Sequence, residues 1–219
     1  MPDAPIRAVV FDFGGVLITP ITRHLTNLAL RHGVPMEQLL LVLMGPREES
    51  TADHPWHRAE RGEIPTADFI HQVQPYAAAQ GLDLVGDEYE VILDGVFDIH
   101  HAVLGDIARL RQAGFRTGLL TNSFREFRAH LEQSIDFGLF DVVVDSSEVG
   151  CRKPEPAIYQ LTTRRVGCRP EEILYLDDFL ANVEGAAAAG WRAVHVHGEA
   201  EVRAAVAPLL GGLPASALP

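Results

Sequence analysis

The chain has 219 residues, 47% of them hydrophobic, so it can bury a sizeable core in one α/β domain, with or without an insertion. Its 30 acidic and 18 basic side chains give a formal net charge of -12, which repels nucleic-acid phosphates and anionic membranes. No apolar run approaches the roughly 20 residues that cross a bilayer, and the first residues lack the order of a signal peptide. We therefore expect a cytoplasmic protein that binds neither nucleic acid nor membrane.

Five short apolar or β-branched runs, bounded by polar or turn residues, predict buried parallel strands. Apolar residues three and four apart, such as Val103, Ile107 and Leu110, lie between most of these runs and predict connecting helices. The alternation predicts an α/β fold built on a Rossmann-like doubly wound parallel sheet. The predicted strands are residues 8–11, 118–120, 142–144, 173–176 and 193–196.

The alternation is interrupted after the first strand, because no strand signal follows until about residue 98 and the apolar spacing there is helical. We predict a Rossmann-like core formed by 1–19 and 99–219, with an inserted small helical domain formed by 20–98. Prolines recur through the insertion and favour several short helices over one long helix. They are Pro35, Pro46, Pro55, Pro65 and Pro75.

Polar side chains follow four of the predicted strands at their carboxyl ends, where open α/β sheets bind ligands. Asp12 follows the first strand, Thr121 and Asn122 the second, and Lys153 comes after the third. Adjacent carboxylates, Asp177 and Asp178, end the fourth strand, and such a pair repels itself unless a cation or a lysine compensates. Converging loops should bring these groups into one site.

This ordered set resembles the haloacid dehalogenase-like superfamily, whose pattern is an Asp, a Ser or Thr, a Lys and an acidic pair at successive strand ends. The likeness extends to subfamily I with its helical cap, because residues 56–64 look like a cap segment. The chain also resembles the phosphatase domain of soluble epoxide hydrolases and bacterial sugar-1-phosphate phosphatases. This resemblance implies a phosphoric monoester hydrolase, acting on a small phosphorylated metabolite as a monomer or homodimer.

The resemblance assigns a role to each residue of the set. Asp12 is the expected nucleophile, and Mg²⁺ is the expected cofactor, held by Asp12, the Gly14 carbonyl and Asp178. Asp177 is expected to orient Lys153 or a metal-bound water, although the sequence leaves open which member of the acidic pair contacts the metal. Thr121, the Asn122 backbone N–H and Lys153 are expected to bind phosphate.

Gly14 departs from the family pattern, which has a second Asp there as the general acid and base. A carbonyl ligand survives this change, but proton transfer does not, and its loss typically costs about 10²–10⁴-fold in rate. His24, His54 and His57 of the insertion are candidate replacements. A sugar 1-phosphate, with its better leaving group, would suit a weakened acid.

Two alternatives remain. A 2-haloacid dehalogenase would use Asp12 to attack carbon without a metal, although such enzymes usually lack the acidic pair retained here. A noncatalytic phospho-ligand binding protein would have lost turnover together with the second Asp.

Overall fold

A computed structural model describes residues 4–20, 22–45, 54–84 and 97–211. It contains a five-stranded parallel sheet with the order β3-β2-β1-β4-β5, so β1 lies at the centre between β2 and β4. The doubly wound α/β fold is thereby confirmed, and all five strands lie where the sequence predicts them, within two residues at either end. The strands are β1 (Ala8–Phe11), β2 (Arg116–Thr121), β3 (Val142–Asp145), β4 (Ile173–Asp177) and β5 (Arg192–His195).

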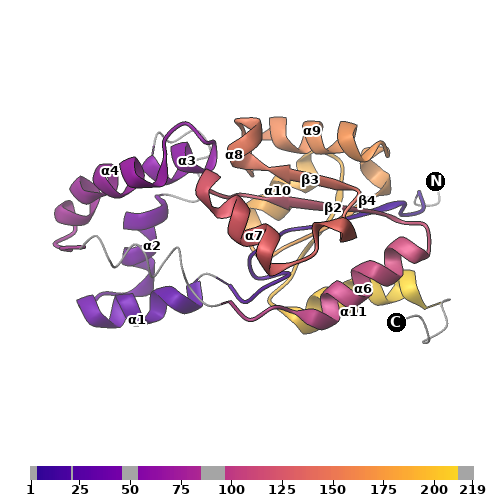
Figure 1. Cartoon of the computed structure of the whole chain (residues 1–219), viewed down its shortest axis with the longest axis horizontal. Helices are drawn as coiled ribbons and strands as arrows, with labels where there is room; N and C mark the ends of the chain where they lie inside the picture. The colour runs from indigo at the N-terminus through magenta and orange to yellow at the C-terminus, as the bar shows by residue number, and fades with distance from the viewer. Residues whose placement is uncertain (1–3, 21, 46–53, 85–96, 212–219) are drawn as a thin grey trace.

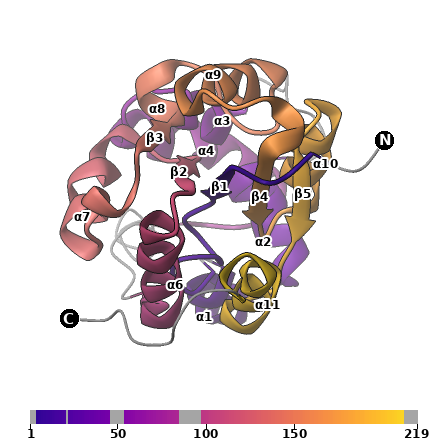
Figure 2. The same cartoon turned by 90° about the vertical axis from the view of Figure 1, so that its right-hand side faces the viewer.

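Helices cover both faces of the sheet (Figures 1 and 2). Side chains that alternate along β1 explain this, since Val9 and Phe11 join one hydrophobic cluster whereas Ala8 and Val10 join another. The first cluster includes residues of α6 (His101–Gln112), α7 (Arg128–Ser134) and α11 (Glu199–Leu210). The second includes residues of α9 (Pro156–Val166) and α10 (Leu180–Ala188). The remaining short elements are η1 (Arg125–Phe127), η2 (Phe137–Leu139), α8 (Ser146–Val149) and η3 (Pro170–Glu172).

The segment between β1 and α6 contains short helices that extend beyond the sheet (Figure 1). They share a hydrophobic cluster of their own, in which Leu39, Phe69 and Val73 are buried. Phe124, from the loop after β2, also belongs to this cluster and ties it to the sheet. The described helices are α1 (Thr22–His32), α2 (Met36–Met44), α3 (Pro55–Glu60) and α4 (Thr66–Ala79).

Three of the prolines named above stand at helix starts, but Pro75 does not separate helices. Pro35 and Pro65 precede α2 and α4, and Pro55 is the first residue of α3. Pro75 lies inside α4, where both it and His71, four residues earlier, are exposed. Water can therefore bind the His71 carbonyl that proline leaves without a helical donor. Pro46 lies outside the described residues. Within the described ranges, no helix is both long and apolar enough to span a membrane.

Candidate active site

The polar residues singled out in the sequence meet at one edge of the sheet. Parallel pairing aligns Phe11 with Leu119 on one side and Leu176 on the other, so the next residues of β1, β2 and β4 emerge together. Asp12 follows β1, Thr121 ends β2, and Asp177 ends β4. Lys153 reaches the same place from the loop between α8 and α9.

Lys153 bridges two of the carboxylates. Its Nζ lies 2.6 Å from Asp12 Oδ1 and 2.7 Å from Asp177 Oδ2, and its side chain is almost fully buried. Burial lowers the pKa of Lys153, but Asp12 and then Asp177 outweigh burial, so the net pKa is raised. The lysine is therefore a permanent positive charge between two carboxylates.

Asp177 is saturated with hydrogen-bond donors. Apart from Lys153, its carboxylate accepts from the Tyr175 hydroxyl, from Asn182 Nδ2 at 3.0 and 3.1 Å, and from the Phe179 backbone N–H at 2.8 Å. The side chain is fully buried and does not line the neighbouring cavity. Asp177 therefore holds Lys153 and the following loop in place.

Asp178 has the opposite character, because its buried Oδ1 has no hydrogen-bond partner. Burial, followed by the charges of Asp12 and Asp177, raises its pKa to about 8. Burial also raises the pKa of Asp12 to about 7, since it outweighs the opposing charge of Lys153. For both carboxylates, burial thus outweighs the positive charge of Lys153.

Asp12, Asp177 and Asp178 each offer one oxygen, and these oxygens lie within 4.8 Å of one another. A set of oxygen donors alone suits a hard divalent cation such as Mg²⁺. The orphaned Asp178 oxygen is what such an ion would satisfy, so the residues fit the group that the resemblance implies.

Two adjacent glycines follow Asp12, and they differ in what surrounds them. Gly15 has a φ of +69°, and a Cβ built there would lie 2.2 Å from Asp178 Oδ2. Gly15 is therefore required both by the turn and by the position of Asp178. A Cβ at Gly14 would meet no heavy atom within 4 Å, so a side chain there is not excluded by packing.

The side chain of Asn122 has a function that the sequence did not reveal. Its Nδ2 donates to the Lys153 carbonyl at 3.0 Å, and its Oδ1 accepts from the Lys153 N–H at 2.9 Å. This two-point contact fixes the lysine backbone across 31 residues of sequence. Thr121 is buried beside it and lines the cavity, with its hydroxyl 3.4 Å from the Asn122 carbonyl oxygen.

A cavity of about 760 Å³ opens over Asp12, Lys153 and Asp178. The side away from the carboxylates is largely apolar, and it includes residues of both the sheet loops and the inserted helices. This cavity could receive a small organic molecule with its charged end at Asp12. Its apolar lining includes Ile18, Met44, Trp56, Phe97, Phe124, Phe127 and Leu131.

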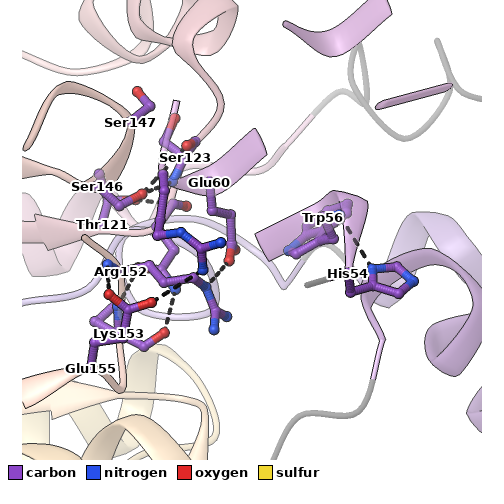
Figure 3. A network of polar contacts seen from close by, with 12 residues as sticks. His54, Trp56, Glu60, Thr121, Ser123, Ser146, Ser147, Arg152, Lys153 and Glu155 are labelled. Carbon is purple, nitrogen blue, oxygen red and sulfur yellow. Dashed lines mark hydrogen bonds and ion pairs between the residues drawn. The ribbon is translucent and has the colours of Figure 1, made fainter. Parts of the chain in front are cut away.

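A buried ion pair joins α3 to the core at the wall of this cavity. Glu60 Oε2 accepts from Arg152 Nε, and Figure 3 shows the two side chains pointing toward one another beside Lys153. Nearby, Arg125 Nη2 donates to the Gly62 carbonyl at 2.9 Å, and the Thr66 hydroxyl donates to Glu126 at 2.5 Å. The sequence did not predict the contact of Glu60 with Arg152, whose only signal is that Arg152 stands next to Lys153.

The three candidate histidines lie in different surroundings. His54 caps α3, with its Nδ1 accepting the Trp56 N–H at 3.2 Å (Figure 3). Burial, and then the neighbouring His57, lower its pKa to about 4, and it does not line the cavity. His57 is also buried but does line the cavity. The side chain of His24 lies outside the described residues.

Curated proteins similar to this chain include both phosphatases and a dehalogenase. A mouse protein named acyl-CoA dehydrogenase family member 10 is 28% identical over 87% of this chain, which spans only 18% of the mouse protein. Phosphatase MT3486 of Mycobacterium tuberculosis is 29% identical, with 95% of each chain covered. The (S)-2-haloacid dehalogenase 1 of a Pseudomonas species is 25% identical, with 88% of this chain and 85% of that protein covered.

Solved structures share the fold. A protein from Porphyromonas gingivalis described as a predicted HAD-like family hydrolase has a TM-score of 0.67 and 23% identity, covering 96% of this chain and all of that one. A HAD family enzyme from Bacteroides thetaiotaomicron, in a complex with magnesium and inorganic phosphate, has a TM-score of 0.63 and 20% identity, covering 87% and 93%.

A family model described as haloacid dehalogenase-like hydrolase matches residues 6–190, a range that contains every site residue discussed above. The chain therefore belongs to the haloacid dehalogenase-like hydrolases.

Proposed function

We propose that this hydrolase is a magnesium-dependent phosphatase that cleaves a small phosphate monoester through a phospho-Asp12 intermediate. The observation that carries the proposal is the juxtaposition of Asp12, Lys153 and an unpartnered Asp178 oxygen at the floor of one cavity. Similarity to a mycobacterial phosphatase over nearly the whole chain supports it.

An anionic nucleophile must overcome repulsion by an anionic phosphate. Asp12, Asp178 and the Gly14 carbonyl would hold Mg²⁺, which would supply positive charge to the phosphoryl oxygens. Lys153 neutralises part of the remaining charge and keeps the Asp12 carboxylate oriented, since its Nζ contacts Oδ1 at 2.6 Å. The free Asp12 oxygen then attacks phosphorus, and the bond from phosphorus to the substrate alcohol breaks.

The neighbouring residues prepare this step. Asp177 and Asn122 fix Lys153 through its ammonium group and its backbone respectively. The Thr121 hydroxyl and the Asn122 backbone N–H would hold phosphoryl oxygens that are not transferred. Water subsequently attacks phospho-Asp12, which releases phosphate and regenerates the carboxylate.

We further propose that residues 20–98 form a cap over the active site. Met44 and Trp56 of this segment line the cavity with Ile18 and Phe127, so the alcohol portion of the substrate would lie in apolar surroundings from which water is excluded. A sugar 1-phosphate as the substrate, and a monomeric or homodimeric state, stay predictions.

The test measures p-nitrophenol release from p-nitrophenyl phosphate by the wild type and by Asp12→Asn, with Mg²⁺ and with EDTA. We expect release that requires both the metal and Asp12, with a loss of at least about 10³-fold in Asp12→Asn because the nucleophile is removed. Metal-independent release of chloride from 2-chloropropanoate would instead identify a dehalogenase, as similarity to the Pseudomonas enzyme allows. Phosphate binding without any turnover would identify a binding protein.

A further inference from the structure

We propose that His57, a residue of α3, is the general acid and base of the reaction, in the place of the side chain that Gly14 lacks. The inference rests on the proposed phosphatase function. It assigns a catalytic residue where the family pattern is broken.

Gly14 provides no general acid beside the proposed nucleophile, Asp12. Gly14 lines the cavity, and a Cβ there would have no heavy atom within 4 Å. Gly14 itself supplies no acid group at the position where the family has its second Asp. A proton donor must reach the leaving oxygen from another wall of the cavity.

Apart from Asp12, Lys153, Asp178 and Arg152, the titratable groups that line the described cavity are Glu184, His195 and His197 of the core and His57 and Glu60 of the inserted helices. Glu60 is bound to Arg152. His195 Nε2 lies 3.0 Å from the Asp178 carbonyl oxygen, and the His197 ring lies edge-on to the His195 ring at a centroid distance of 4.4 Å, so this pair lies beside the proposed metal ligands. Glu184 is exposed on α10. His57 is buried and belongs to the inserted helices.

The position of His57 agrees with the direction in which the substrate alcohol would leave. In an in-line displacement the leaving oxygen points away from the nucleophile. Asp12 lines the cavity together with Trp56 and His57 of the inserted helices, which extend beyond one end of the sheet (Figure 1). His57 precedes Glu60 by three residues, so both side chains lie on one face of α3. Glu60 contacts Arg152, the neighbour of Lys153, and both His57 and Glu60 line the cavity that contains Asp12.

The imidazole of His57 gives a proton in the first half-reaction and takes one back in the second. As Asp12 attacks, the bond from phosphorus to the alcohol oxygen breaks, and protonated His57 gives its proton to that oxygen. Neutral His57 then takes a proton from water, and the resulting hydroxide attacks phosphorus and displaces the Asp12 carboxylate. Phosphate leaves, and His57 is again protonated. The ring of His54 lies 5.9 Å from that of His57, and Glu60, three residues further along α3, is paired with Arg152.

The experiment compares kcat/KM for butyl phosphate and p-nitrophenyl phosphate, with saturating Mg²⁺, in the wild type and in His57→Asn. Butanol requires protonation to leave, whereas p-nitrophenolate does not. Because kcat/KM includes steps only through alcohol release, slow hydrolysis of phospho-Asp12 does not obscure the comparison. We expect a loss of about 10²–10⁴-fold for butyl phosphate and less than about tenfold for p-nitrophenyl phosphate.

A rescue variant makes the assignment specific. Gly14→Asp installs a carboxyl group where packing leaves room, so the double variant His57→Asn with Gly14→Asp should recover at least about tenfold of the butyl phosphate activity. His54→Asn is the matched control, since it removes the neighbouring ring, keeps a capping side chain and should leave the ratio of the two substrates unchanged.

Equal losses for both substrates, no loss for either, or failure of Gly14→Asp to restore butyl phosphate turnover would each overturn the proposal. Circular dichroism verifies that the variants fold, and His57→Gln provides the same comparison of the two substrates if His57→Asn does not fold. Absence of Asp12-dependent activity in the wild type would refute the phosphatase function itself, which is a different result.

Discussion

Gly15 and Asp178 lie so close together that no side chain fits at Gly15 while Asp178 keeps its position. The replacement Gly15→Ala must place a methyl group where Asp178 Oδ2 now lies, in a backbone conformation that already disfavours alanine. We expect a loss of about 1–3 kcal/mol in the free energy of unfolding and about 10²-fold in turnover, because Asp178 is displaced. Urea unfolding and initial rates measure the two effects.

Gly33→Ala is the control for backbone strain alone. Gly33 has a φ of +65°, close to that of Gly15, and an added Cβ there would meet no atom within 4 Å. It should lose a similar free energy of unfolding while keeping its turnover. Equal turnover in both alanine variants would show that the position of Asp178 does not depend on Gly15.

The identity of these polar residues could be predicted from the sequence, but the division of work between Asp177 and Asp178 could not. The side chains of adjacent residues at a strand end point in opposite directions. The sequence does not show which of the two is buried in the protein and which faces the cavity. Here Tyr175 and Asn182 surround Asp177 with donors, whereas Asp178 faces the cavity. Likewise, the Asn122 side chain turned out to clamp Lys153, a contact that no local spacing rule describes.

At the scale of elements, β1 to β4 were predictable because they are largely buried and contain apolar runs, whereas β5 is only half-buried and shows the weaker signal of Ala193 and Val194. The contact of α3 with the core was not predictable, since Glu60 and Arg152 are separated by 92 residues and ordinary charged side chains at the surface look the same in sequence. Their burial is a tertiary property. The same holds for Pro75, whose exposure lets α4 continue through it.

The replacement Glu60→Gln tests what this contact contributes to stability. It leaves the Arg152 guanidinium buried with its Nη1 already unpartnered and without a countercharge, so we expect a loss of about 3–5 kcal/mol in the free energy of unfolding. Urea denaturation measures the change.

Glu132→Gln, which breaks the exposed i,i+4 pair with Arg128, is the matched control and should cost less than about 1 kcal/mol. If both variants unfold at the same urea concentration, the buried pair does not hold α3 to the core.

For the molecule as a whole, magnesium should act as a stabilising ligand. Binding to the folded state alone raises the unfolding temperature, and saturation by a hundredfold excess over the Kd corresponds to about 2.7 kcal/mol. We expect thermal unfolding followed by circular dichroism to show a rise of several degrees with Mg²⁺. Asp178→Asn should abolish this rise.

The same variant should unfold at a higher temperature than the wild type when EDTA is present, because it removes a buried carboxylate that Asp12 and Asp177 repel. Asp83→Asn, at an exposed position remote from the carboxylate cluster in the sequence, should respond to Mg²⁺ as the wild type does. A full magnesium response in Asp178→Asn would contradict the proposed ligand set.

The central position of β1 affects the order in which parts of the sheet unfold locally. β1 is hydrogen-bonded to a strand on either side and buried on both faces, whereas β3 and β5 have only one neighbour each. Local fluctuations begin where protection is least, so amide protons at the sheet edges should exchange with solvent well before those that precede Asp12. Asp12, the proposed nucleophile, thus follows the strand that should unfold last, and partial unfolding at the sheet edges should leave its surroundings ordered.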